Sequence, residues 1–136
     1  MFPFVGALLT ILVGVLRDKL STHIFISVLC TESIFAVLLL FSSWQYTLSY
    51  SVGGWSPPIG VEYRLDRQSA LSLLLVAITS LLIGLYAVWY FEHYAKHRTY
   101  FYAAMLAFLS GILGVIATWD IFNLYVMMEL AAASSI

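Results

Sequence analysis

Long apolar runs separated by short polar segments dominate the chain. A helix that crosses the roughly 30 Å hydrocarbon core of a membrane needs about 20 mainly apolar residues. Several runs meet or approach this length, and backbone that faces lipid must satisfy its own hydrogen bonds, so each run is predicted to be a helix. The predicted spans are residues 2–16, 23–43, 69–90, 100–118 and 120–136. They predict an all-α transmembrane protein with about five spans, forming a single membrane domain over residues 1–136.

The segment between the second and third spans, residues 44–68, is the one sizeable part predicted to lie outside the membrane. Two short β-prone stretches flank the Gly/Pro-rich sequence Gly53-Gly-Trp-Ser-Pro-Pro58, which is typical of a β-hairpin. Trp44, Tyr46 and Tyr50 are of the kind that gathers at membrane–water interfaces. The sequence therefore predicts a short extramembrane hairpin between spans two and three.

The basic residues predict an orientation. The loops after spans one and three hold more Lys and Arg than the loop after span two, which contains Arg64 and Arg67. Because cytoplasmic loops are enriched in Lys and Arg, the first pair of loops is predicted to be cytoplasmic and the N-terminus to lie outside. The basic residues follow the first span instead of preceding it, which is the reverse of a signal peptide, so the span is predicted to be retained.

Composition excludes several classes of function. Hydrophobic residues make up 62% of the chain and charged residues 10%, and the net charge is -1. A small soluble domain could not hide so much apolar surface, and nucleic-acid binders carry an excess of basic residues. We expect the lipid bilayer and other membrane subunits as partners, no nucleic acid, no cofactor, no metal and no catalytic residue in this chain. His93 and His97 lie at the membrane edge, and we interpret them as part of a solvated interfacial turn.

Glu129 is the main candidate for function, because an acid inside a membrane span is costly to bury. It lies about ten residues into its helix, roughly 15 Å from the start and therefore near the middle of the bilayer. A carboxyl group in that position can bind and release a proton, or pair with a cation. The alternative is a neutral glutamate that only fastens two helices together by hydrogen bonds.

Glu32 and Asp120 are weaker candidates for the same ion path. Glu32 is also deep in its span, and it serves either in function or as a helix-contact acid bonded to the nearby hydroxyl groups of Ser27, Thr31 and Ser33. Asp120 begins the fifth span, where an acid caps free N–H groups and complements the helix dipole. We interpret Asp120 mainly as a cap, with a role as the point where protons enter as the alternative.

Small residues recur at helical spacing in the first and fourth spans, which predicts close helix packing at positions such as Gly111 and Gly114. Neither Lys nor Arg occurs in the middle of any predicted span. A cation that pairs with Glu129 inside the membrane must then come from another polypeptide. We therefore expect an obligate complex, in which one partner subunit supplies a buried lysine to Glu129.

Two motifs resemble one family of membrane proteins. They are Gly53-Gly-Trp-Ser-Pro-Pro-Ile-Gly60 with the following Leu65-Asp66-Arg67-Gln68-Ser69-Ala70-Leu71, and Asp120-Ile-Phe-Asn-Leu-Tyr-Val-Met-Met-Glu129. Both resemble the D-type subunit of multisubunit Mrp sodium/proton antiporters, and the antiporter-like subunits of respiratory complex I and membrane-bound hydrogenases share the pattern. The resemblance covers nearly the whole chain and corresponds to the first third or less of such a subunit.

The resemblance implies a function beyond what spacing can show. It implies a subunit of a complex that translocates protons or sodium ions across a prokaryotic cell membrane, with protons passing along buried charged residues. Glu129 matches the key glutamate of the family's fifth helix, whose partner is a lysine on a later helix. The alternative is a subunit that does not conduct ions and that positions or anchors a membrane-bound redox complex.

Overall fold

The computed structural model describes residues 2–44, 46–55, 60–94 and 98–135. Within these residues the helices are α1 (Phe2–Leu16), α2 (Asp18–Ser43), α3 (Arg67–Tyr94), α4 (Arg98–Ala117) and α5 (Ile121–Ser134). Stretches of α2, α3 and α4 are long and apolar enough to cross a membrane, whereas α1 and α5 are shorter apolar helices. The prediction of a helical membrane protein with five helices, and a hairpin between the second and third, is confirmed.

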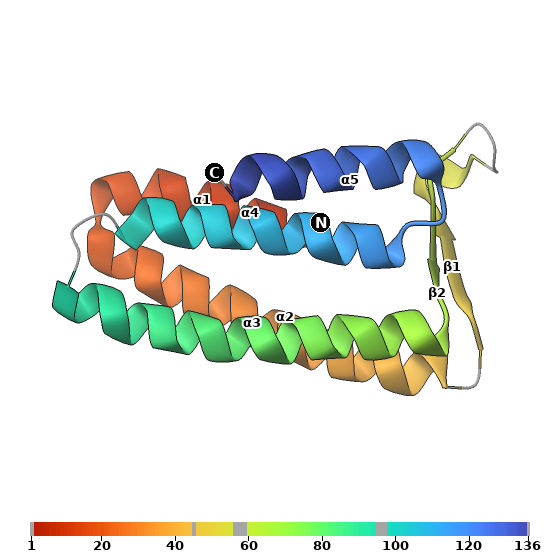
Figure 1. Cartoon of the computed structure of the whole chain (residues 1–136), viewed down its shortest axis with the longest axis horizontal. Coiled ribbons are helices and arrows are strands. Elements are labelled where there is room, and N and C mark those ends of the chain that lie inside the picture. The colour runs from red at the N-terminus through yellow and green to blue at the C-terminus, as the bar shows by residue number, and fades with distance from the viewer. Residues whose placement is uncertain (1, 45, 56–59, 95–97, 136) are drawn as a thin grey trace.

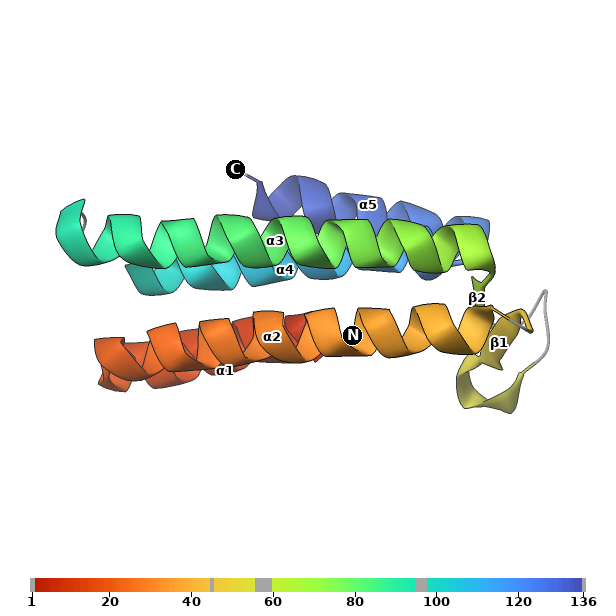
Figure 2. The same ribbon diagram turned by 90° about the horizontal axis from the view of Figure 1, so that it is seen from below.

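The helices lie side by side along the long axis of the molecule (Figure 1). In the perpendicular view, α1 and α2 form one layer, and α3, α4 and α5 form the other (Figure 2). The main neighbours are α3 with α2, α2 with α1, α1 with α4, and α4 with α5. α5 therefore packs mainly on one helix, and α2 contacts three.

The hydrophobic core lies where α1, α2 and α4 meet. The rings of Phe25 and Tyr102, both fully buried, stack with centroids 4.4 Å apart. Apolar side chains from the three helices complete this cluster; they are Ala7, Val28, Leu29, Leu106 and Leu109. Such stacking adds specific geometry to the burial of two large rings, and it fixes α4 against α2.

Small residues let the helices approach closely, as predicted. A Cβ atom on Gly111 would lie 2.7 Å from the backbone nitrogen of Ala131, and one on Gly114 would lie 2.5 Å from the sulfur of Met127. Both contacts join α4 to α5. Gly6 has the same role between α1 and α2, where an added Cβ would lie 2.8 Å from a methyl carbon of Val28. Close packing of the helices leaves no room for a side chain at these positions, as is common at helix interfaces in membranes.

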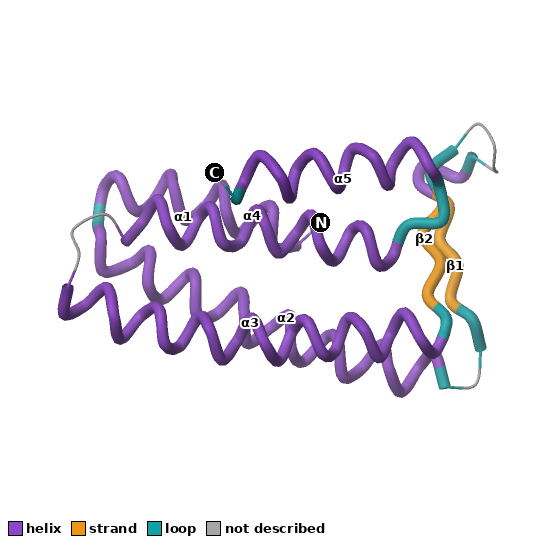
Figure 3. The backbone as a smooth tube through the Cα atoms, in the orientation of Figure 1, coloured by secondary structure: helices purple, strands orange, loops and turns teal. Residues whose placement is uncertain are grey.

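The hairpin consists of β1 (Leu48–Ser51) and β2 (Glu62–Leu65), which pair antiparallel with Tyr50 opposite Tyr63. A 3₁₀ turn, Val52–Gly54, follows β1, and Gly53 and Gly54 have φ angles of 69° and 76°, which glycine adopts most readily. Residues 56–59, which carry the prolines of the predicted turn, lie outside the described residues. The strands lie across one end of the helix bundle (Figure 3).

The hairpin is bonded to the connection between α4 and α5. The backbone N–H of Trp119 donates to the carbonyl oxygen of Glu62 at 2.9 Å, and Tyr63 forms a β-bridge with Thr118. The guanidinium of Arg64 lies 4.7 Å from the ring centroid of Trp119, a distance at which a cation is attracted to an aromatic face. The hairpin thus connects the α2–α3 pair to the α4–α5 pair and covers this end of the bundle.

Candidate functional site

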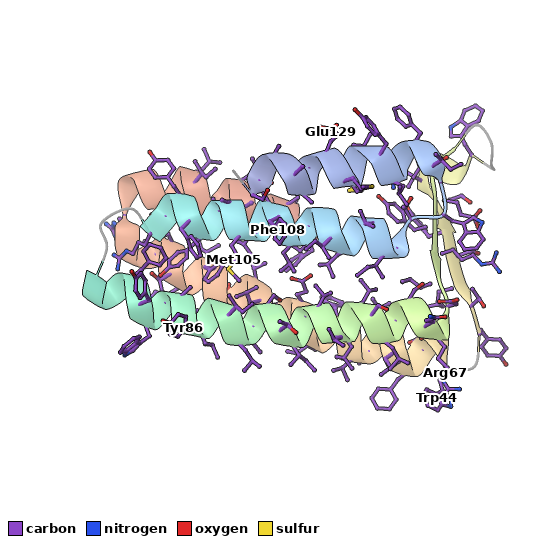
Figure 4. The ribbon with its side chains drawn as sticks, in the orientation of Figure 1. Trp44, Arg67, Tyr86, Met105, Phe108 and Glu129 are labelled. Carbon is purple, nitrogen blue, oxygen red and sulfur yellow. The ribbon has the colours of Figure 1, made fainter. Side chains whose placement is uncertain are left out.

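Glu129 lies on α5 with its side chain exposed on the surface of this chain. Figure 4 places it on the outer side of α5, away from α4. Its carboxylate lies close enough to the hydroxyl of Tyr125, one helical turn earlier, to interact with it. Among the described residues, no basic side chain forms an ion pair with Glu129. The described part of the chain therefore supplies no cation to Glu129.

The face of α5 that carries Glu129 is strongly apolar. Phe122, Tyr125 and Met128 are 72%, 61% and 55% exposed. A glutamate in such a face is typical of a surface that other helices cover inside a membrane, because an acid facing lipid would be costly. The depth of Glu129 in the membrane stays a prediction from its sequence position, and the structure adds which face of α5 it occupies.

Glu32 has the opposite environment. Its side chain is 8% exposed, and neither carboxylate oxygen has a hydrogen-bond partner in the part of the chain that the structure describes. It lies on the wall of a cavity of about 420 Å³ near the hairpin end of the bundle. A buried polar group without a partner is rare in native proteins and calls for an explanation.

The interpretation that Glu32 is bonded to neighbouring hydroxyl groups is wrong. Ser27 donates to the carbonyl oxygen of Ile24 and Thr31 to that of Ser27, at 2.8 and 2.7 Å. Ser33 donates to the carbonyl oxygen of Leu29 at 2.9 Å. Serine and threonine hydroxyls inside helices commonly bond to the backbone of the preceding turn, which leaves them unavailable to a neighbouring side chain.

Asp120 caps α5. Its side-chain oxygen accepts a hydrogen bond from the backbone N–H of Asn123 at 2.8 Å, which is the usual geometry of an N-cap. The side-chain amide of Asn123 in turn donates to the hydroxyl of Thr118 at 2.9 Å. The capping interpretation of Asp120 therefore agrees with the geometry, and a part in proton transfer stays a prediction.

Sequence reasoning missed a second cap, at the start of α3. The backbone N–H of Ser69 donates to a carboxylate oxygen of Asp66 at 2.7 Å, and this bond lowers the pKa of Asp66 below its usual value. The signal was present, since an aspartate just before an apolar run is a typical N-cap residue. The next residue, Arg67, places its guanidinium 3.5 Å from the ring centroid of Trp44, so the ends of α2 and α3 are joined (Figure 4).

The histidine interpretation is not tested. His97 and the side chain of His93 lie outside the described residues. Within the described part of the chain, no three His, Cys, Asp or Glu side chains are grouped closely enough to hold a metal ion.

The chain is an integral membrane protein of the polytopic helical class, and comparison with known proteins defines it further. Residues 50–101 match the family model described as "NADH-Ubiquinone oxidoreductase (complex I), chain 5 N-terminus". A protein of Staphylococcus aureus (strain JH9), named "Putative antiporter subunit mnhD2", is 31% identical over 140 residues, covering 99% of this chain and 27% of the relative. The chain thus spans about a quarter of the length of the curated relatives it matches.

Two solved structures share the fold. One chain of the membrane-bound sulfane sulfur reductase, an archaeal respiratory membrane complex, superposes with a TM-score of 0.88 at 27% identity, covering 98% of this chain and 28% of that one. A chain of the Mrp complex from Dietzia sp. DQ12-45-1b superposes with a TM-score of 0.81 at 22% identity, covering 98% of this chain and 25% of that one. The chain corresponds to the N-terminal portion of an antiporter subunit of the Mrp D-type and complex I chain 5 kind, as its motifs indicated.

Proposed function

We propose that this chain is the N-terminal part of a subunit that moves protons or sodium ions in a multisubunit membrane complex. Glu129 is the residue that pairs with a cation in the ion path. The observation that carries the proposal is the position of Glu129: it lies within the apolar exposed face of α5, in a chain that matches antiporter subunits over nearly its whole length. An acid in such a face would be costly against lipid, so we expect another subunit to cover it, and a lysine on that subunit would neutralise the carboxylate.

The chemistry of such a pair supports a switch. A carboxylate next to a cation stays ionised, because the opposite charge stabilises it. When the cation moves away, the low dielectric of the membrane favours proton uptake by the carboxyl group. The pair therefore couples the movement of a positive side chain to the binding and release of a proton. An N-terminus outside the cell remains a prediction from the basic residues.

The test is Glu129→Gln in the complete complex. Glutamine keeps the size and hydrogen-bonding capacity of the side chain but cannot ionise, so sodium-driven proton flux in inverted membrane vesicles should be lost while the complex still assembles. Glu62→Gln, on the hairpin, is the matched control and should transport normally. Wild-type flux in Glu129→Gln would remove the residue from the ion path.

A second function is favoured by one comparison. The likeness to a chain of an archaeal sulfur-reducing respiratory complex is compatible with a subunit that positions or anchors a redox complex without conducting ions. In that case Glu129→Gln leaves ion movement unchanged, and changes in the hairpin or in the connection between α3 and α4 reduce attachment of the redox subunits.

A further inference from the structure

A cavity of about 420 Å³ lies near the hairpin end of the bundle, and all five helices and both strands contribute to its wall. Most of the lining side chains are apolar. The polar side chains on the wall are those of Glu32, Tyr50, Tyr63 and Ser110. A cavity of this size with polar groups on its wall has room for several water molecules.

Glu32 lies deep in this arrangement. It is eleven residues before the last residue of α2, Ser43, which places it on the order of 16 Å from the hairpin end of that helix. Both of its oxygens lack a partner among the described residues, and its side chain is 8% exposed. The neighbouring Ser33 directs its hydroxyl to the backbone of Leu29 and, at 3.4 Å, of Ala77.

The groups that line the cavity also determine which charge state of Glu32 is favoured there. The other titratable groups on the wall are the phenols of Tyr50 and Tyr63, and no Lys, Arg or His of the described residues contributes to it. The amino group of Met1 lies outside the described residues. A carboxylate without a donor or a cation is strongly disfavoured in such surroundings, whereas the protonated acid is tolerated.

A bound metal cation fits the lining less well than a proton. Hard cations take several oxygen ligands to replace the water that they lose. Apart from Glu32, the side-chain oxygens on the wall are three hydroxyl groups, which come from different elements of the structure. A proton needs only one carboxyl oxygen and a route to water.

We propose that Glu32 is a second protonatable site of this chain, a neutral carboxylic acid at mid-membrane depth that exchanges its proton through the cavity toward the hairpin end. The inference does not depend on a transport role for Glu129. It also explains why Glu32 has no hydrogen-bond partner among the described residues: a carboxylate held by several donors would keep its charge and would not exchange its proton.

Dicyclohexylcarbodiimide tests the charge state in membranes that contain the complete complex. A carboxylic acid adds across one C=N bond of the reagent: the acid oxygen bonds to the central carbon, and the acid proton goes to nitrogen. The acyl group then migrates from oxygen to nitrogen and leaves a stable N-acylurea. At neutral pH we expect peptide mass spectrometry to find this adduct on Glu32 and not on Glu62, which is on the hairpin outside the predicted spans.

Infrared spectroscopy provides an independent measurement that does not require a reagent to reach the site. The difference between wild type and Glu32→Gln should contain the carbonyl band of a protonated carboxyl group, and this band should shift after transfer to D₂O. If neither the adduct nor the band is found, Glu32 is ionised and the proposal is wrong. Sodium chloride that reduces labelling several-fold relative to choline chloride, at constant pH, would instead assign a sodium site and overturn the proton assignment.

A pair of alanine variants tests the route. Ala36 and Ala87 are each 5% exposed, but only Ala36 lines the cavity. Ala36→Val should slow the deuterium shift of the Glu32 band several-fold because the added methyl groups fill the path, and Ala87→Val should leave the rate unchanged. Equal exchange rates in the two variants would show that the proton does not pass through this cavity.

Discussion

Glu32 and Glu129 both lie well inside apolar helices, yet the molecule gives them opposite surroundings. Glu32 is on α2, which packs against α1, α3 and α4, and it is 8% exposed. Glu129 is on α5, which packs mainly against α4, and its side chain is exposed. Depth along a helix is therefore a poor guide to burial, which depends on how many neighbouring helices cover the face that carries the residue.

This difference in burial corresponds to two different environments for an acid in a membrane. The surroundings of Glu32 are supplied within this chain, by an apolar cavity in which its oxygens lack partners among the described residues. The described bundle leaves Glu129 exposed, and in the proposed pairing a cation from outside this bundle lies next to its carboxylate. The first arrangement favours a neutral acid, and the second favours an ion pair.

The sharpest test of this comparison replaces each glutamate by methionine in the complete complex. If the proposed ion pair exists, Glu129→Met should destabilise the complex by about 3–5 kcal/mol, because it leaves the paired cation buried without its counter-charge. Glu32→Met should stabilise it by about 1–3 kcal/mol, because it removes a buried polar group that has no hydrogen-bond partner among the described residues. Thermal unfolding in detergent measures both changes. Shifts of the same sign in the two variants would mean that the two sites do not differ in this way.

The next largest effect is expected for α5, because this helix packs mainly against α4. Gly111→Val should destabilise the packing of α5 on α4 by about 1–3 kcal/mol, because the new side chain would meet the backbone of Ala131, which cannot rotate away. Ala104→Val, at an exposed position of the same helix, is the matched control. Hydrogen exchange of the α5 amides should increase in the first variant only. Unchanged protection of α5 in Gly111→Val would show that this contact does not hold the helix.

The sequence predicted the helices and the hairpin because the signals for these elements are local. Apolar runs mark spans, and Gly/Pro-rich residues mark the turn. Boundaries were less accurate: α2 begins at Asp18 instead of residue 23, because a helix continues past the membrane edge through polar residues that a hydropathy pattern excludes. Hydropathy marks the membrane boundary, and hydrogen bonding decides where the helix ends.

The candidate site was predicted less completely. The sequence singled out three acids, and their surroundings depend on tertiary packing. The nearby hydroxyls suggested partners for Glu32, whereas each donates to its own helix backbone, as Ser27 does to Ile24. The exposed face of Glu129 and the cavity beside Glu32 arise from which helices neighbour α5 and α2, and one sequence does not contain that information.

A smaller effect is expected at the start of α5. Asp120→Ala should cost about 1 kcal/mol, since the backbone N–H of Asn123 loses its acceptor. Asp120→Asn retains an acceptor and should be close to wild type in stability. Hydrogen exchange measures this effect: exchange in the first turn of α5 should be faster in the alanine variant only. Equal loss of transport in both variants with no change in exchange would favour a protonation role over the cap.

The smallest expected effect concerns the cap of α3, which tests whether a helix with broader packing depends less on its first turn. The N–H of Ser69 lowers the pKa of Asp66, so the folded-state value is below the unfolded one. Stabilisation by this cap is then complete above the ordinary aspartate pKa and is lost as pH falls through the lowered folded-state value. Protection of the first amides of α3 should decrease at acid pH in wild type, but not in Asp66→Asn, whose amide oxygen accepts the same bond without titrating. An identical acid dependence in the two proteins would rule out Asp66 as the titrating cap.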